Sequence, residues 1–290
     1  METVATSPIA TLSGLDQTED VSLREHYRQQ YGSFAEELDA AVRRDTFSED
    51  FGQNSWHTAA EHERFRSWLD FDPTARLLDV ACGAGGPALR LARLTGCRVI
   101  GIDVQVEGIA AARAAAERAA LAGQAAFEPH DANQPLPFPD AVFDAVLCVD
   151  AINHLPDRSA VLHEWWRVLK PGGRLVFTDP IVVTGPLSNE EIAIRAGIAY
   201  FLFVPLGYDD RLLTETGFDI AIREDRTEEV AMVASRWHAA RAKHEAALRE
   251  VEGDPRYAGQ QAFFAMCARL AHEGRLSRFA YLARKPQRAP

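Results

Sequence analysis

The sequence predicts an α/β fold built on a doubly wound, mostly parallel sheet of seven strands. From Ala75 onward, short apolar runs alternate with helical patterns, and strands that alternate with helices indicate parallel pairing. The run at residues 77–80 leads into a glycine-rich turn and then a helical pattern. The chain has 290 residues, which is enough for one such domain with additional helices before and within it.

The predicted elements follow in order along the chain. Strands are expected at Arg76–Val80, Arg98–Asp103, Ala126–Pro129, Phe143–Val149, Arg174–Asp179, Phe218–Arg223 and Ser277–Ala283. Helices are expected at 88–95, 107–122 and 158–169, and the alanine-rich 107–122 segment is the strongest helix former. After Asp179 the alternation breaks, and helices are predicted at Asn189–Phe203, Arg211–Thr216, 228–251 and 258–273.

This pattern divides the chain into five segments. They are a disordered tail (1–20), a helical cap (21–70), a ligand-binding core (71–180), a lid of helices that includes a strand at 218–223 (181–275), and a last strand with its tail (276–290). Two lid helices lie between two late strands, so we expect them to be inserted into the sheet domain.

Composition excludes several classes of protein. The net charge of −11 and the scattered basic residues argue against nucleic-acid binding. No apolar run is long enough for a membrane span, and the first twenty residues lack the features of a signal peptide. The four cysteines lie far apart without metal-binding spacing. We therefore expect a cytoplasmic protein with free buried thiols, no metal and no membrane partner.

The glycine-rich turn is the strongest local signal. Residues 77–88 read LLDVACGAGGPA, and Gly83, Gly85 and Ala88 fit the dinucleotide-binding pattern G-x-G-x-x-G/A. Asp79 lies four residues before Gly83, where a carboxylate would repel phosphate and attract an ammonium group. The turn alone leaves a dinucleotide and a cationic ligand both open.

Two further acids close predicted strands. Asp103 follows the second strand about twenty residues after the turn, a position typical of a carboxylate that accepts ribose hydroxyls. Asp131 follows the third strand, where it can accept from an adenine amino group. Asp131 can equally form an Asx turn that leads into Asn133.

Two longer motifs complete the pattern. They are PFPDAVFDAVLCVDAINHLPD at 137–157 and LKPGGRLVFTD at 169–179. With the turn, they make the chain resemble a class I S-adenosylmethionine-dependent methyltransferase with a Rossmann-like core. The layout of cap, core and lid is similar to sarcosine and phosphoethanolamine methyltransferases and to natural-product sugar O-methyltransferases.

The resemblance implies a division of roles around S-adenosylmethionine. Asp79 and the backbone of the turn would hold the amino-acid end, and Asp103 would bind the ribose. Val149 and Asp150, at the end of the fourth strand, would lie near the sulfonium. The implied cofactor-binding residues are Asp79, Ala81, Gly83, Gly85, Asp103, Val104, Asp131, Ala132, Val149 and Asp150. Ala81 stands where many members have glycine, although the turn is kept.

His154 is the first candidate for a general base, because it follows the fourth strand at the crevice mouth. It can alternatively cap a helix and fix the loop. His57 is the second candidate, in a segment that can fold over the site or simply begin a helix. The substrate-binding candidates are Asn153, Trp56, Tyr200, Phe203, Trp237 and Phe264, each of which can instead be core.

The predicted activity is transfer of the methyl group to an O, N or C atom of a small molecule, with release of S-adenosylhomocysteine. The alternative is an enzyme of the same fold that cyclises or cleaves the aminobutyryl chain of S-adenosylmethionine and releases methylthioadenosine. A non-catalytic binding subunit and a nicotinamide oxidoreductase are weaker alternatives. The sequence leaves a monomer and a homodimer both open.

Overall fold

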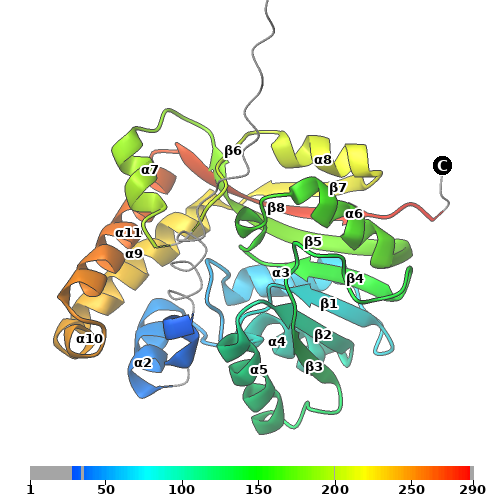
Figure 1. Cartoon of the computed structure of the whole chain (residues 1–290), viewed down its shortest axis with the longest axis horizontal. Coiled ribbons are helices and arrows are strands. Elements are labelled where there is room, and N and C mark those ends of the chain that lie inside the picture. The colour runs from blue at the N-terminus through cyan, green and yellow to red at the C-terminus, as the bar shows by residue number, and fades with distance from the viewer. Residues whose placement is uncertain (1–27, 34–35, 199, 288–290) are drawn as a thin grey trace, which may run out of the picture.

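A computed structural model describes residues 28–33, 36–198 and 200–287. The predicted tail at 1–20 lies outside the described residues. Within them the strands form one sheet in the order β3-β2-β1-β4-β5-β8-β7, and β6 pairs with β5 beside this path (Figure 1). The strands are β1 (Arg76–Val80), β2 (Arg98–Asp103), β3 (Ala125–Pro129), β4 (Phe143–Cys148), β5 (Leu169–Val183), β6 (Val204–Pro205), β7 (Asp219–Asp225) and β8 (Leu276–Arg284).

The sheet is parallel except at β8, which runs antiparallel to both β5 and β7. The strand order reverses between β1 and β4, because β2 and β3 continue on one side of β1 and β5 on the other. In a doubly wound sheet, ligands bind outside the carboxyl ends of the strands at such a reversal. The predicted fold class is confirmed, and the glycine-rich turn lies at this point.

Helices cover both faces of the sheet. They are α2 (Glu37–Thr46), α3 (Ala59–Leu69), α4 (Gly86–Thr95), α5 (Val106–Arg118), α6 (Arg158–Val168), α7 (Asn189–Arg195), α8 (Tyr208–Thr216), α9 (Thr227–Lys243), α10 (Glu245–Glu252) and α11 (Asp254–His272). Alternate strand residues face opposite sides. Leu77 packs with α3, α4 and α5, whereas Leu78 packs with α6 and α8.

The helices α9, α10 and α11 lie between β7 and β8 in the chain, where the sequence predicts two helices. They lie beside α2 at the left of Figure 1. Their shared core is aromatic: Trp56 of the cap packs with Trp237 of α9 and Phe264 of α11. Among the described residues, no helix combines the length and apolar character that crossing a membrane requires.

Three predicted elements differ from the structure. The helix expected at Asn189–Phe203 ends at Arg195, and its aromatic end instead packs Phe201 against Phe263 and His154. The helix expected at 228–251 breaks at His244 into α9 and α10. Helix α8 packs on α6 against the sheet rather than within the lid, because Leu212 and Leu213 complete the core there.

Candidate active site

The loop between β1 and α4 has an unusual backbone. Ala81, Gly83 and Gly85 have φ values of 55°, 53° and 76°, all in the left-handed region that favours glycine. A Cβ on Gly85 would lie 2.8 Å from the ring of Phe127. The backbone therefore turns tightly from β1 into the N-terminus of α4, the helix end that favours a negatively charged group.

Asp79 is 3% exposed at the end of β1. No hydrogen bond or ion pair to its carboxylate is formed by any residue that the structure describes. Burial and the charge of Asp103 raise its pKa well above the usual value of 3.8. A buried carboxylate without a protein partner fits the ammonium group of a bound amino-acid moiety, which would restore its charged form.

Asp103 ties the loop to β2. Its two carboxylate oxygens accept hydrogen bonds from the N–H groups of Gly83 and Gln105, each at 2.8 Å. Burial raises its pKa. Each oxygen keeps a further lone pair, so the carboxylate can accept two ribose hydroxyls without releasing the loop. Its neighbour Val104 is 45% exposed, although it is apolar.

At the end of β3, Asp131 accepts from the backbone and side-chain nitrogens of Asn133 at 2.9 and 3.0 Å. This is the Asx turn that the sequence offered as an alternative. One carboxylate oxygen makes both bonds, so the turn leaves the other oxygen for a ligand. Ala132 is buried beside it. The adenine-binding role stays a prediction.

Asp150 begins the loop after β4 with φ at 53°. Its carboxylate accepts from the N–H of Trp56 at 2.9 Å, the hydroxyl of Thr178 at 2.7 Å and the guanidinium of Arg278 at 2.6 Å. These contacts direct the carboxylate into the protein. The role of Val149 and Asp150 beside the sulfonium stays a prediction, and this orientation favours their backbone over the Asp150 carboxylate for it.

Arg278 connects Asp150 to the cap. Its guanidinium, completely buried on β8, donates to both oxygens of Glu61 at 2.6 and 3.0 Å. Glu61 also accepts from His57 at 3.0 Å, and His57 contacts His62 at 3.0 Å. The network is formed by His62, His57, Glu61, Arg278 and Asp150. Sequence reasoning missed Arg278 and Glu61, since no local pattern marks them.

The network changes the interpretation of His57. Both ring nitrogens are engaged, and the side chain has no exposed surface. Its ring stacks on Phe65 with 5.0 Å between centroids. A general base must reach the proton that it removes. The geometry therefore favours a structural role for His57, contrary to its place as second catalytic candidate.

His154 is half-buried in the turn that follows β4. Its Nδ1 donates to the carbonyl of Tyr200 at 2.7 Å, which leaves Nε2 as an acceptor, 3.2 Å from Nδ2 of Asn153. Burial lowers the pKa of His154 to about 4. The ring is therefore neutral at pH 7, with its basic nitrogen oriented by two neighbours. Oδ1 of Asn153 is buried without a hydrogen-bond partner among the described residues.

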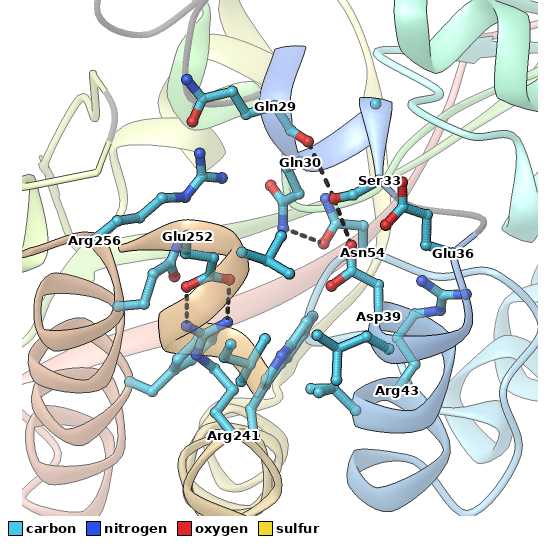
Figure 2. Close-up of a pocket in the computed structure, with 18 residues that line it drawn as sticks. Gln29, Gln30, Ser33, Glu36, Asp39, Arg43, Asn54, Arg241, Glu252 and Arg256 are labelled. Atoms are coloured by element: carbon cyan, nitrogen blue, oxygen red, sulfur yellow. Dashed lines mark hydrogen bonds and ion pairs between the residues drawn. The ribbon is translucent and has the colours of Figure 1, made fainter. Parts of the chain in front are cut away.

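The predicted substrate aromatics separate into two groups. Tyr200 and Phe203 follow α7, and Phe203 packs near Ile181 and Leu270. Trp237 and Phe264 stack with 5.0 Å between centroids and border a cavity of about 510 Å³. The cavity lies between the segments 29–33 and 36–43 on one side and helices α9, α10 and α11 on the other (Figure 2).

One short segment separates this cavity from the glycine loop. Residues 28–32 are helical, and a Cβ on Gly83 would lie 2.4 Å from the hydroxyl of Tyr31. Gln29 and Gln30 of the same segment line the cavity. Tyr31 therefore covers the loop that the sequence assigns to the cofactor. The prediction of a helical cap over 21–70 indicated such a cover, but not which residue supplies it.

A domain within this chain matches a known family. Residues 78–177 match the family model described as a methyltransferase domain. This match spans the strands β1 to β5 and the glycine-rich loop, and the whole fold is shared with solved methyltransferase structures. One of these methyltransferases is solved in complex with S-adenosylmethionine. The carboxylate of Asp79, which has no partner among the described residues, and the remaining lone pairs of Asp103 fit that cofactor.

One individual relative is similar over more than half of this chain. The chain is 35% identical over 166 residues to 27-O-demethylrifamycin SV methyltransferase of Amycolatopsis mediterranei, covering 56% of this chain and 61% of that protein. The chain thus spans less than two thirds of that relative.

Two solved structures share the fold. The [4+2]-cyclase SpnF is 27% identical, with a TM-score of 0.68, over 89% of this chain and 97% of that one. Phosphoethanolamine N-methyltransferase 2 of Haemonchus contortus, in complex with S-adenosylmethionine, is 20% identical with a TM-score of 0.74, over 94% and 61% of the two chains.

Proposed function

We propose that this protein transfers the methyl group of S-adenosylmethionine to a small-molecule acceptor and releases S-adenosylhomocysteine. The observation that carries the proposal is the pair of buried carboxylates, Asp79 and Asp103, at the strand-order reversal beside the left-handed loop. Asp79 and the loop backbone would hold the amino-acid end, and Asp103 the ribose. The cofactor supplies a methyl group that is already bonded to a good leaving group.

The chain's own contribution is alignment and exclusion of water. Tyr31 covers the loop from the cap side, and Trp56 is held over the end of β4 by its N–H bond to Asp150. For an acceptor that must lose a proton, His154 is the proposed base through Nε2, once the acceptor hydroxyl displaces the Asn153 N–H from the single lone pair of that nitrogen. Asn153 orients that nitrogen and offers its free Oδ1 to a donor group on the acceptor.

The acceptor is proposed to be a small natural product, methylated at O, N or C. The likeness to an enzyme named for a rifamycin intermediate supports this class. No nucleic acid or membrane enters the proposal, and the protein would act as a monomer or homodimer in the cytoplasm. The four cysteines, all buried and unpaired, support a reducing compartment.

Binding and turnover test the proposal separately. By calorimetry, the purified protein should bind S-adenosylhomocysteine in the micromolar range and NADH at least about a hundredfold more weakly, a gap of nearly 3 kcal/mol. With a panel of small hydroxylated and amine acceptors, mass spectrometry should detect S-adenosylhomocysteine together with a methylated product. Release of methylthioadenosine instead would establish cleavage or cyclisation of the cofactor and refute methyl transfer.

His154→Ala tests the proposed base. We expect turnover of a hydroxyl acceptor to fall by about 10²–10⁴-fold, the usual contribution of a positioned base, while affinity for S-adenosylhomocysteine stays unchanged. Asn153→Asp serves as a companion that alters the orientation of the ring without removing it. A wild-type rate in His154→Ala would remove this residue as the base.

A second candidate is a cyclase that closes a ring within a bound substrate. The 27% identity to the [4+2]-cyclase SpnF, over 97% of that chain, supports this second candidate. The two candidates differ in their effect on the cofactor. Methyl transfer consumes one S-adenosylmethionine per product, whereas an intramolecular cycloaddition leaves the cofactor intact and the product isomeric with the substrate.

A further inference from the structure

We propose that the cavity between α2 and the lid helices binds the distal part of the acceptor, and that this part is an apolar ring system carrying one anionic group, anchored by Arg256. The role as an acceptor site rests on the proposed function; the ligand chemistry rests on the cavity itself. A volume of about 510 Å³ lies within the usual range for small-molecule sites.

The inner wall of the cavity is apolar. Trp237 and Phe264 stack nearly parallel, at 15°, and both are less than 9% exposed. Val42 and Leu248 are buried beside them, and Val251 borders the cavity although it is 64% exposed. A wall of stacked rings and aliphatic groups favours a flat apolar ligand.

The opposite wall carries neutral polar groups. Gln30 donates to Asn54 at 2.8 Å across it (Figure 2). On the apolar side, one turn before Phe264 on α11, Gln260 adds a largely buried amide. These amides can bond hydroxyl or carbonyl groups on a ring without requiring a charge.

The charged groups of the cavity are mostly compensated. Arg241 makes two hydrogen bonds to Glu252, at 3.1 and 2.6 Å, and Arg43 pairs with Asp50 at 3.2 Å. Asp39 accepts from Ser33 at 2.6 Å, and burial raises its pKa, which favours the neutral form. These groups therefore produce no strong positive or negative electrostatic potential in the cavity.

Arg256 differs from these residues. It lies in the first turn of α11, and no ion pair or hydrogen bond joins its guanidinium to any part of the chain that the structure describes. Its Nε is buried without a partner. Figure 2 shows the side chain extending across the cavity toward Gln29. Glu36, which forms no ion pair with any described residue, is exposed on the far side. A carboxylate or similar anion on the ligand would accept hydrogen bonds from this guanidinium and balance its charge.

The position of the cavity explains why it would take the distal part. Its wall at residues 29–33 is also the segment whose Tyr31 covers the glycine loop. Trp56 packs on Trp237 and Phe264 at the inner end, and its N–H bonds Asp150 after β4. A ligand in the cavity therefore lies one layer of side chains from the predicted methyl donor.

The test measures binding of 2-naphthoate and its neutral isostere 2-naphthamide to the full-length protein by calorimetry, without cofactor. We expect naphthoate to bind about tenfold more tightly, the scale of one hydrogen bond to a charged group. Arg256→Gln should abolish that preference and leave naphthamide binding unchanged. Arg236→Gln, an exposed arginine of α9 outside the cavity, should leave both affinities unchanged.

A second variant adds a negative charge instead of removing a positive one. Val251→Glu, at an exposed position of the rim, should weaken naphthoate binding several-fold and spare naphthamide. No binding of either probe, equal affinities for the two, or equal losses in Arg256→Gln and Arg236→Gln would overturn the proposal. Binding as expected in a protein that transfers no methyl group would refute the proposed function and leave the site in place.

Discussion

Replacing Arg278 should destabilise the protein more than any surface substitution of the same type. Its guanidinium is completely buried and bonds two carboxylates, Glu61 and Asp150, at 2.6 Å each. In Arg278→Met both acids stay buried without their main partner. Removing one partner of a buried pair costs about 3–5 kcal/mol, because an uncompensated charge remains. With a urea slope of about 3 kcal/mol/M, the unfolding midpoint should fall by about 1–2 M.

The matched control is Arg64→Met. Arg64 also makes two hydrogen bonds to one glutamate, Glu224, at 2.7 and 2.8 Å, but its side chain is 49% exposed. Exposed pairs contribute about 0–1 kcal/mol, so the midpoint should barely move. Urea unfolding at pH 7.5, followed by tryptophan fluorescence, compares the two variants directly.

A double variant tests the physical reason. Arg278 and His57 hold the pKa of Glu61 well below its usual 4.5 against the opposing effect of burial. A depressed pKa stabilises the fold above about pH 4.5, and that stability is lost as the pH falls toward the folded-state pKa. Glu61→Gln added to Arg278→Met removes one stranded charge and should recover part of the loss. A single variant that loses less than about 1 kcal/mol, or a double variant that recovers nothing, would refute the reasoning.

Three further predictions concern the loop and the network. Asp103→Ala should weaken S-adenosylhomocysteine binding by about 1.5–3 kcal/mol, measured by calorimetry, because it removes the ribose acceptor and frees the N–H of Gly83; unchanged affinity would contradict the assignment. Ala81→Gly should stabilise the protein by about 0.5–1 kcal/mol by relieving its left-handed φ of 55°, whereas Ala239→Gly in α9 should cost about 1 kcal/mol; equal losses in urea unfolding would show that the turn is not strained. His62→Gln tests a pH dependence: burial lowers the pKa of His62 from 6.5 to about 2, so the unfolded chain binds the proton first and stability falls below pH 6.5. Between pH 7.5 and 5 this residue should account for about 2 kcal/mol of lost stability. The His62→Gln variant should not show this loss of stability between pH 7.5 and 5. Parallel pH profiles of stability for the variant and the unmodified protein would exclude a contribution from His62.

Local sequence patterns predicted most of the core. The run at 77–80 and the turn after it specify a strand, a tight loop and a helix within a dozen residues, so Asp79, Gly83 and Gly85 could be placed without long-range information. Asp103 was found in the same way, at the end of the next strand. The prediction failed where tertiary packing overrides local preference, as in the helix at Asn189–Phe203, whose aromatic end packs on the lid instead.

The candidate site shows the same difference between parts set by local sequence and parts set by tertiary packing. The cofactor side follows from strand ends and one loop, which neighbouring residues determine through backbone conformation and charge. The acceptor side depends on residues far apart in the chain: Arg278 meets Glu61 across 217 positions and Asp150 across 128. The cavity likewise needs the cap and three lid helices together. The sequence by itself determined the fold class and the strand, tight loop and helix of the predicted cofactor site, since short-range sterics and periodicity specify them. Only the tertiary structure decided that His57 is buried with both ring nitrogens engaged, that Arg278 joins cap to core, and that Arg256 borders a cavity, because burial and partner choice arise when distant segments pack together.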